Sequence, residues 1–206
     1  MVRTTESLTS SLLALAEREQ AFAKVLDTHG HPEPRASAPG VETLLRTIVG
    51  QQVSVAAARS MWKKLTGIFG EPVDLQKLIE ASDEKMREAG MSRQKAGYLR
   101  SLAGLVLSGE LDLGHLPDDD EEAISKLTKI KGIGRWSAEI YLLFAEGRHD
   151  VWPAGDLAVQ IEIGRLMGLD GKPTEKQLRE LAEKWRPHRG AAAVLAWHSY
   201  NAPPLD

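Results

Sequence analysis

Two motifs in the third quarter of the chain combine residue types that could bind an anion and act as an acid. Gly132 and Gly134 lie between two stretches of helical pattern, and the carboxylate of Asp156 follows them. Glycine adopts backbone angles that are closed to other residues, so a two-glycine turn can expose its N–H groups where the next helix begins. Such N–H groups, together with the positive end of a helix, bind phosphate oxygens. The pattern predicts a phosphate-binding turn, the glycine hairpin (residues 131–135), followed by an acid.

Each motif also has a simpler structural interpretation. A Gly-x-Gly sequence between helices often makes only a tight connection, and Asp156 stands where the N-cap of a helix belongs. Trp136 and Trp197 could be core residues, and Gln51 and Gln52 could be polar residues at a helix junction. These alternatives stay open from residue types alone.

Composition narrows the chemistry that the chain could perform. The 206 residues are 42% hydrophobic, which is ample for a packed core. The absence of cysteine excludes disulfides, thiolate zinc sites and cysteine-ligated iron–sulfur clusters. The first residues lack the apolar core of a signal peptide, and no stretch has the apolar length needed to cross a membrane. We expect a soluble intracellular protein, in the cytoplasm or nucleoid of a bacterium or the nucleus of a eukaryote.

The net charge of −3 does not by itself indicate a nucleic-acid-binding protein, so any such role must depend on a local patch. The positive residues fall into two groups, which are Arg59, Lys63 and Lys64, and then Lys126, Lys129, Lys131 and Arg135. Residues 118–122 form an acidic run, which we interpret as solvated surface.

The spacing of apolar residues predicts an all-α chain. We expect about ten helices, over residues 6–28, two helices meeting near 51–54, then 75–79, 83–89, 92–107, 120–129, 133–146, 156–167, 173–185 and 186–200. Ser54 and Ser92 are expected N-caps, Gly90 an expected C-terminal stop, and Pro187 an expected first-turn residue.

With both motifs in place, the chain resembles the helix-hairpin-helix superfamily of base-excision DNA glycosylases, and within it the AlkA-like 3-methyladenine DNA glycosylase II family. Three further segments carry the resemblance, LLRTIVGQQVSVAAARSMWKKL (44–65), GMSRQKAGYLRSLA (90–103) and WRPHRGAAAVLAWH (185–198), so that it covers about residues 41–200. It implies one catalytic domain over residues 1–206, in two helical lobes with a DNA-binding groove between them. The helix-hairpin-helix would occupy about 127–146 and the loop of the catalytic acid 150–156.

The resemblance also implies roles for individual residues. Asp156 falls on the family's catalytic aspartate. The base pocket would contain Trp136, Trp197, Ile140 and Leu157. DNA would be bound by Lys131, Gly132, Ile133, Gly134, Arg135 and Ser137, and by Gln51 or, more favoured, Gln52 as a wedge that fills the gap left by the extruded base. The backbone carbonyls of Thr128, Ile130 and Ile133 are candidate ligands of an alkali ion, Na⁺ or K⁺, and no other cofactor is expected.

Four positions depart from the pattern of the family. Gly155 replaces a second acid of some members, Ile140 replaces a frequent tyrosine, and Leu157 stands where an aromatic residue can occur. Trp136 stands where members that also cut the DNA backbone place a lysine, whose amine would attack the sugar. The missing cysteines separately distinguish the chain from the cluster-bearing endonuclease III branch.

We therefore expect a monofunctional glycosylase that acts on double-stranded DNA containing alkylated bases, such as 3-methyladenine and 7-methylguanine, and leaves an abasic site. The protein is expected to be a monomer and not to associate with a membrane. One alternative is a non-catalytic helix-hairpin-helix module that binds damaged DNA. A second is an oxidised-base glycosylase with lyase activity, against which Trp136 argues. The preference among damaged bases stays open, because it depends on packing around the pocket.

Overall fold

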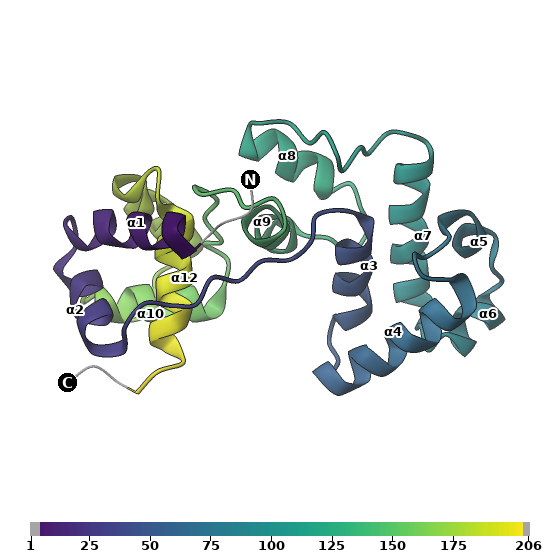
Figure 1. Ribbon diagram of the computed structural model, residues 1–206, viewed down its shortest axis with the longest axis horizontal. Helices are drawn as coiled ribbons and strands as arrows, with labels where there is room; N and C mark the ends of the chain where they lie inside the picture. The colour runs from purple at the N-terminus through teal and green to yellow at the C-terminus, as the bar shows by residue number, and fades with distance from the viewer. Residues whose placement is uncertain (1–4, 204–206) are drawn as a thin grey trace. The chain divides into compact units, whose positions relative to one another are not determined.

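The computed structural model describes residues 5–203, which contain twelve α-helices, one 3₁₀ helix and no strand (Figure 1). The all-α prediction is confirmed. The chain divides into two compact units. Unit 1 contains the residues up to Ser37 and those from Leu142 onward, and unit 2 contains Ala38–Tyr141.

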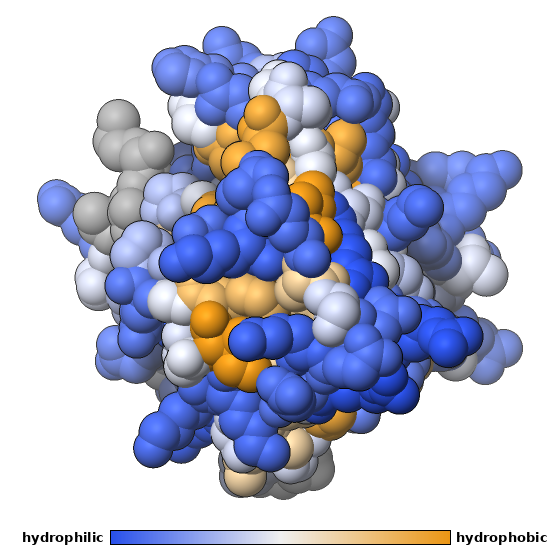
Figure 2. All heavy atoms as spheres, turned by 90° about the vertical axis from the view of Figure 1, so that its right-hand side faces the viewer, coloured by the Kyte–Doolittle hydropathy of each residue, from blue (hydrophilic) through white to orange (hydrophobic). Residues whose placement is uncertain are grey.

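Unit 2 is built around one long central helix. Its elements are α3 (Val41–Gly50), α4 (Val55–Phe69), α5 (Leu75–Glu80), α6 (Asp83–Glu88), α7 (Arg93–Leu107), α8 (Asp120–Leu127) and most of α9 (Arg135–Phe144). α7 packs against α3, α5 and α6, and its residues Leu99 and Leu102 are fully buried. The face on the α5–α7 side is largely hydrophilic, with small separate apolar patches (Figure 2).

Unit 1 is built around the last helix. Its elements are α1 (Thr5–Ala16), α2 (Gln20–His29), α10 (Leu157–Leu166), α11 (Glu175–Ala182), η1 (Glu183–Trp185) and α12 (Arg189–Tyr200). α12 packs against α1, α2 and α10, and the residues of its Gly190–Ala196 segment are all buried. Glycine and alanine let neighbouring helices approach closely on every side, as a helix in the middle of a core requires.

The predicted caps are confirmed, whereas two boundaries differ from the prediction. The side chains of Ser54 and Ser92 accept the N–H groups of Ala57 and Lys95 at 3.2 Å. The helical pattern of residues 6–28 belongs to two helices, α1 and α2, because the charged residues 17–19 leave the helix. Pro187 precedes the N-cap of α12 and is therefore outside the first turn of that helix.

Candidate functional site

The glycine hairpin of unit 2 is a tight turn that requires glycine at one of its two positions. Gly132 has φ +84°, and a Cβ atom there would overlap the ring of Tyr98. The Ile133 N–H donates to the Ile130 carbonyl at 3.0 Å, and the Lys131 N–H donates to the Ser101 hydroxyl at 3.1 Å. The turn is thus closed internally and attached to α7.

Gly134 differs from Gly132, which corrects the expectation that both glycines need special angles. Its φ is not positive, and a Cβ atom there would have no heavy atom within 4 Å beyond Gly134 itself and its two chain neighbours. The Gly134 carbonyl accepts the Ala138 N–H at 3.0 Å, so α9 begins directly behind it. The first N–H groups of a helix have no intrahelical partner, and here a residue without a side chain stands before them. An anion can therefore approach the end of α9 closely.

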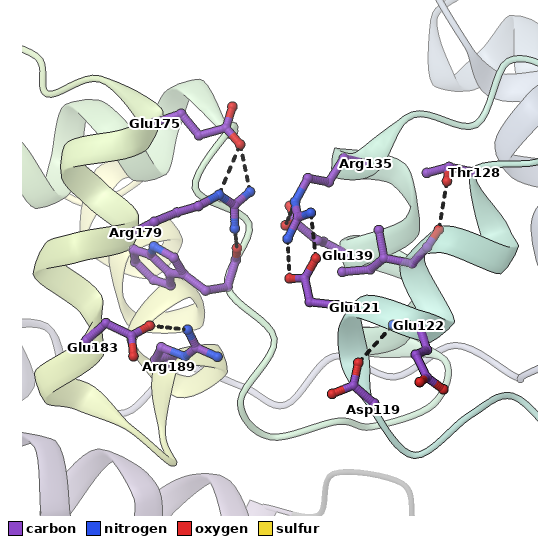
Figure 3. Close-up of polar contacts among 12 residues, drawn as sticks. Asp119, Glu121, Glu122, Thr128, Arg135, Glu139, Glu175, Arg179, Glu183 and Arg189 are labelled. Atoms are coloured by element: carbon purple, nitrogen blue, oxygen red, sulfur yellow. Dashed lines mark hydrogen bonds and ion pairs between the residues drawn. The ribbon is translucent and has the colours of Figure 1, made fainter.

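Arg135 follows the hairpin but points to carboxylates of its own unit (Figure 3). Its guanidinium donates to Glu121 at 2.8 Å and to Glu139 at 2.9 Å. The hydrogen bond that Arg135 donates to Glu121, followed by the charge of Glu139, raises the pKa of Arg135 above its usual range. Glu121 and Asp119 are exposed, as the interpretation of the acidic run as solvated surface predicts. Glu121 in addition pairs with Arg135, and the Asp119 carboxylate caps α8 by accepting the Glu122 N–H at 2.9 Å. The charge of Arg135 is already paired.

The junction of α3 and α4 presents two neighbouring glutamines in different ways. The Gln51 side chain donates to the Gly132 carbonyl at 2.8 Å, so it links this junction to the glycine hairpin. Gln52 is exposed, and its φ of +55° lies in the left-handed region that favours glycine. The structure therefore separates a glutamine that holds the hairpin from one that points outward.

An open groove with a volume of about 990 Å³ lies beside these residues in unit 2. Its lining includes residues from the α3–α4 junction, from α7 and from the hairpin, among them Gln51, Gln52, Lys95, Tyr98, Gly132 and Trp136. Trp136 is 47% exposed, so its interpretation as a core residue is wrong. The lining of the groove thus joins the α3–α4 junction, Gly132 of the hairpin and the first turn of α9.

In unit 1, Asp156 is the N-cap of α10, and it also has a second partner. Its Oδ1 atom accepts the Val159 N–H at 3.0 Å and the indole N–H of Trp197 at 3.0 Å. Asp156 and Trp197 are both half-buried. The cap interpretation is thus correct, but it is incomplete, because Trp197 comes from α12 and fixes the carboxylate from another side.

The loop before Asp156 is held by bonds to its backbone and to its buried tryptophan. The Trp152 indole donates to the Leu178 carbonyl at 3.2 Å, and the Trp152 carbonyl accepts from Arg179 at 3.3 Å. The Gln160 side chain donates to the Ala154 carbonyl at 2.8 Å. At the start of the loop, Asp150 accepts hydrogen bonds from the guanidinium groups of Arg186 and Arg189. The position of Asp156 is therefore fixed by several elements of unit 1.

A small cavity of about 210 Å³ lies against the Trp197 ring. Phe144 forms a further wall, with its ring centroid 5.7 Å from that of Trp197. His31, Glu33 and Arg35 also line the cavity, and the Ser37 N–H donates to the Phe144 carbonyl at 2.9 Å. Sequence reasoning did not single out these residues, because Phe144 fits the apolar pattern of α9 and residues 31–35 read only as helix breakers.

The predicted base-pocket residues are divided between the units. Asp156, Trp197 and Leu157, which is 59% exposed, belong to unit 1. Trp136 and the half-buried Ile140 belong to unit 2. It stays a prediction that these residues form one base pocket, and that a DNA-binding groove lies between the two lobes.

Side-chain metal clusters and membrane-spanning helices are both absent from the part of the chain that the structure describes. Among residues 5–203, no three histidine, aspartate or glutamate side chains are grouped to hold a metal ion. In that range, no helix is long and apolar enough to cross a membrane. The candidate alkali site would use backbone carbonyls, oxygen donors of the kind that hard cations prefer. The Ile130 carbonyl already accepts a hydrogen bond within the turn, and one of its two lone pairs is left for an ion.

Comparisons with known proteins match almost the whole chain. The HhH-GPD superfamily of base excision DNA repair proteins matches residues 45–188. DNA-3-methyladenine glycosylase 1 of Schizosaccharomyces pombe is 30% identical over 198 residues, covering 93% of this chain and 87% of that protein. DNA-3-methyladenine glycosylase 2 of Escherichia coli is also 30% identical, over 209 residues, covering 95% of this chain and 71% of that protein.

The fold has the same relatives. The structure of 3-methyladenine DNA glycosylase from S. pombe in complex with abasic DNA superposes with a TM-score of 0.79 at 28% identity, over 94% of this chain and 97% of that chain. The family match spans more than half of the sequence and contains both the glycine hairpin and Asp156. This chain therefore belongs to the HhH-GPD superfamily of base excision DNA repair proteins.

Proposed function

We propose that this protein is a monofunctional DNA glycosylase that extrudes alkylated bases from double-stranded DNA and hydrolyses their N-glycosidic bonds, leaving abasic sites. Membership of the family and the names of its relatives favour a glycosylase over a non-catalytic binding module. The observation that carries the proposal is the Asp156 carboxylate, which is fixed at the N-terminus of α10 by Val159 and by the Trp197 indole.

The arrangement around Asp156 suits hydrolysis of a bond to a cationic leaving group. Alkylated purines such as 3-methyladenine and 7-methylguanine carry positive charge, so they leave without a strong general acid and stack well on an indole face. As the bond breaks, positive charge develops on the sugar. An ionised Asp156 stabilises that charge and orients or deprotonates the attacking water. The Trp197 ring, held by the same carboxylate, is then positioned to contact the extruded base.

Unit 2 supplies the DNA contacts in this proposal. The N–H groups of the hairpin and of the start of α9 bind a phosphate without reading sequence. Gln52, exposed and left-handed, enters the duplex as the wedge, because Gln51 is already bonded to Gly132. An alkali ion on the carbonyls of Thr128, Ile130 and Ile133 would add positive charge beside the phosphate. The protein would act on DNA as a monomer.

The absence of a lyase step is supported by what occupies the position of the lyase lysine. Trp136 has no amine that could attack the sugar and form a Schiff base. Borohydride reduction of a mixture of the protein and abasic DNA should therefore yield no covalent adduct, whereas a trapped complex on a denaturing gel would contradict monofunctional hydrolysis.

The proposed function is tested by chromatography of the bases released from methylated DNA. Asp156→Asn keeps the shape and the N-cap, since asparagine caps helices as well as aspartate. It removes the negative charge, and we expect the release rate to fall by about a hundred- to a thousandfold or more. Circular dichroism of the variant checks that the fold is retained. Release at the wild-type rate by the folded variant would contradict the role of Asp156.

A further inference from the structure

One face of α7 contacts both of the segments to which DNA contacts have been assigned. Lys95, Tyr98 and Ser101 follow one another at three-residue spacing, which places them on one side of the helix. The Lys95 ammonium donates to the Val49 carbonyl at 2.7 Å, in the last turn of α3. Tyr98 lies against Gly132, and Ser101 accepts the Lys131 N–H. α7 is thus a common support for the α3–α4 junction and the hairpin.

The residue between these supports has a strained backbone. Gln52 has φ +55°, and among residues 5–203 no other non-glycine residue has positive φ. A left-handed non-glycine residue costs free energy and persists only where the surrounding structure holds it. Two hydrogen bonds hold the backbone just before Gln52. Lys95 donates to the carbonyl three residues earlier, that of Val49, and the side chain of the adjacent Gln51 donates to the Gly132 carbonyl at 2.8 Å.

The bond from Lys95 is stronger than an ordinary surface contact. It is a charge-assisted hydrogen bond to a carbonyl at a helix C-terminus, where intrahelical donors are missing and positive charge is favourable. Burial lowers the pKa of the Lys95 ammonium, because the group is partly removed from water where it contacts the Val49 carbonyl. The amine lines the open groove of unit 2, where a fully solvated lysine would point outward to phosphates instead.

We propose that Lys95 and Gln51 are positioning residues that hold Gln52 in its left-handed conformation at a fixed distance from the glycine hairpin. The inference rests on the proposed function, in which Gln52 is the wedge and the hairpin grips the phosphate. It follows that gripping and wedging are coupled. When the hairpin binds the backbone, the Gln51–Gly132 bond places Gln52 at the base step beside it. Neither Lys95 nor Gln51 touches the reacting atoms.

The test compares one lesion in two DNA contexts. A wedge matters when an extruded base leaves a gap in a duplex, and matters little in a single strand, which has no stack to fill. Oligonucleotides with one 7-methylguanine, as single strand or as duplex, are incubated with excess enzyme, and base release is followed. Release by the wild-type protein from both substrates is measured first, and absence of release from the duplex would overturn the proposed function rather than the coupling.

Lys95→Met keeps the length of the side chain and removes the donor. We expect release from the duplex to fall about ten- to a hundredfold, the effect of losing one hydrogen bond to a charged group, with single-strand release within about threefold of wild type. Gln51→Leu should show the same split, and it keeps the test decisive if the first variant fails to fold. Lys77→Met, an exposed lysine of α5, is the matched control and should leave both rates unchanged.

A double-mutant cycle separates positioning from general support of the fold. If Lys95 acts through Gln52, then Lys95→Met should lower the duplex rate little further in a Gln52→Ala background, because the residue that it positions is already gone. A purely structural role would give equal losses on both DNA substrates and additive losses in the cycle. Either of these results would overturn the coupling while leaving the glycosylase function intact.

Discussion

The Asp156 loop of unit 1 and the glycine hairpin of unit 2 are held by different kinds of interaction. The carboxylate of Asp156 is fixed through side chains, above all the Trp197 indole, on a loop whose Trp152 is buried in the core. The hairpin offers backbone N–H groups, and its shape depends on a missing side chain at Gly132 and on the Gln51 amide. The proposed hydrolysis needs one negative charge at a defined position. Binding to the uniform phosphate backbone of DNA needs only hydrogen-bond donors that the phosphate can approach closely.

This difference predicts that substitution by alanine lowers the free energy of unfolding at one glycine of the hairpin and leaves it unchanged at the other. Gly132→Ala forces alanine into φ +84° and into the ring of Tyr98, and should lower the free energy of unfolding by about 2 kcal/mol or more. Gly134→Ala meets open space and should leave unfolding unchanged within about 0.5 kcal/mol. Urea unfolding of both variants measures this. Equal losses would mean that the hairpin is not held by close contact at Gly132.

A second prediction separates two tryptophans of unit 1. Trp197→Phe keeps an aromatic ring but removes the donor to Asp156, and should slow base release about tenfold or more. Trp152→Phe removes the buried hydrogen bond that the indole donates to the Leu178 carbonyl, and should cost about 1 kcal/mol of unfolding free energy with a smaller effect on rate. Single-turnover kinetics and urea unfolding on both variants provide the comparison. Base release by the Trp197→Phe protein at the wild-type rate would contradict the proposal that the indole N–H positions the Asp156 carboxylate.

These contrasts show which features local sequence patterns could predict. Ser54, Ser92 and Asp156 were recognisable as caps, because a cap bonds within three residues of itself. The role of Asp156 as an acid stays a proposal. The bond from Gln51 to Gly132 spans 81 residues, and that from Trp197 to Asp156 spans 41. Periodicity contains no information on such pairs.

The errors have the same physical origin. The break between α1 and α2 lies in charged residues 17–19, which fit a solvated helix face as well as a turn. The pairing of Arg135 with Glu121 depends on how α8 and α9 pack, so local sequence patterns could not predict it. The assignment of Arg135 to DNA stays a prediction. The resemblance to a family supplied the fold and the proposed role of Asp156, but not the partners that fix its carboxylate.

The pairing of Arg135 predicts a small effect on DNA binding. Removing one full phosphate contact should change the slope of log affinity against log salt by about 0.9. Arg135→Met should change it by much less, because Glu121 and Glu139 already neutralise this charge. Glu121→Gln should make the slope slightly more negative, because it removes one of the two carboxylates that neutralise the charge of Arg135. Fluorescence anisotropy with an abasic duplex at several salt concentrations measures both, and a full-contact loss in Arg135→Met would place its guanidinium on DNA.

The smallest expected effect concerns pH and unit 1 alone. Burial, with a smaller contribution from Arg18, lowers the pKa of His188 below its usual 6.5. Between the folded and unfolded pKa values the unfolded chain binds more protons, so unfolding free energy should rise with pH through that window and fall as pH drops below about 6.5. The difference should be about 1 kcal/mol or less. His188→Gln should flatten the dependence, and an unchanged profile would exclude His188 as its source.

The division between an acid in one unit and a backbone grip in the other is tested most directly by single-turnover base release at saturating enzyme, with DNA affinity measured in parallel. Asp156→Asn should bind abasic duplex as wild type does and release bases about a hundred- to a thousandfold more slowly. Gly134→Ala, with a methyl group where the phosphate approaches, should bind more weakly yet release bases at the wild-type rate once saturated. A slow Gly134→Ala at saturation, or a fast Asp156→Asn, would contradict the division.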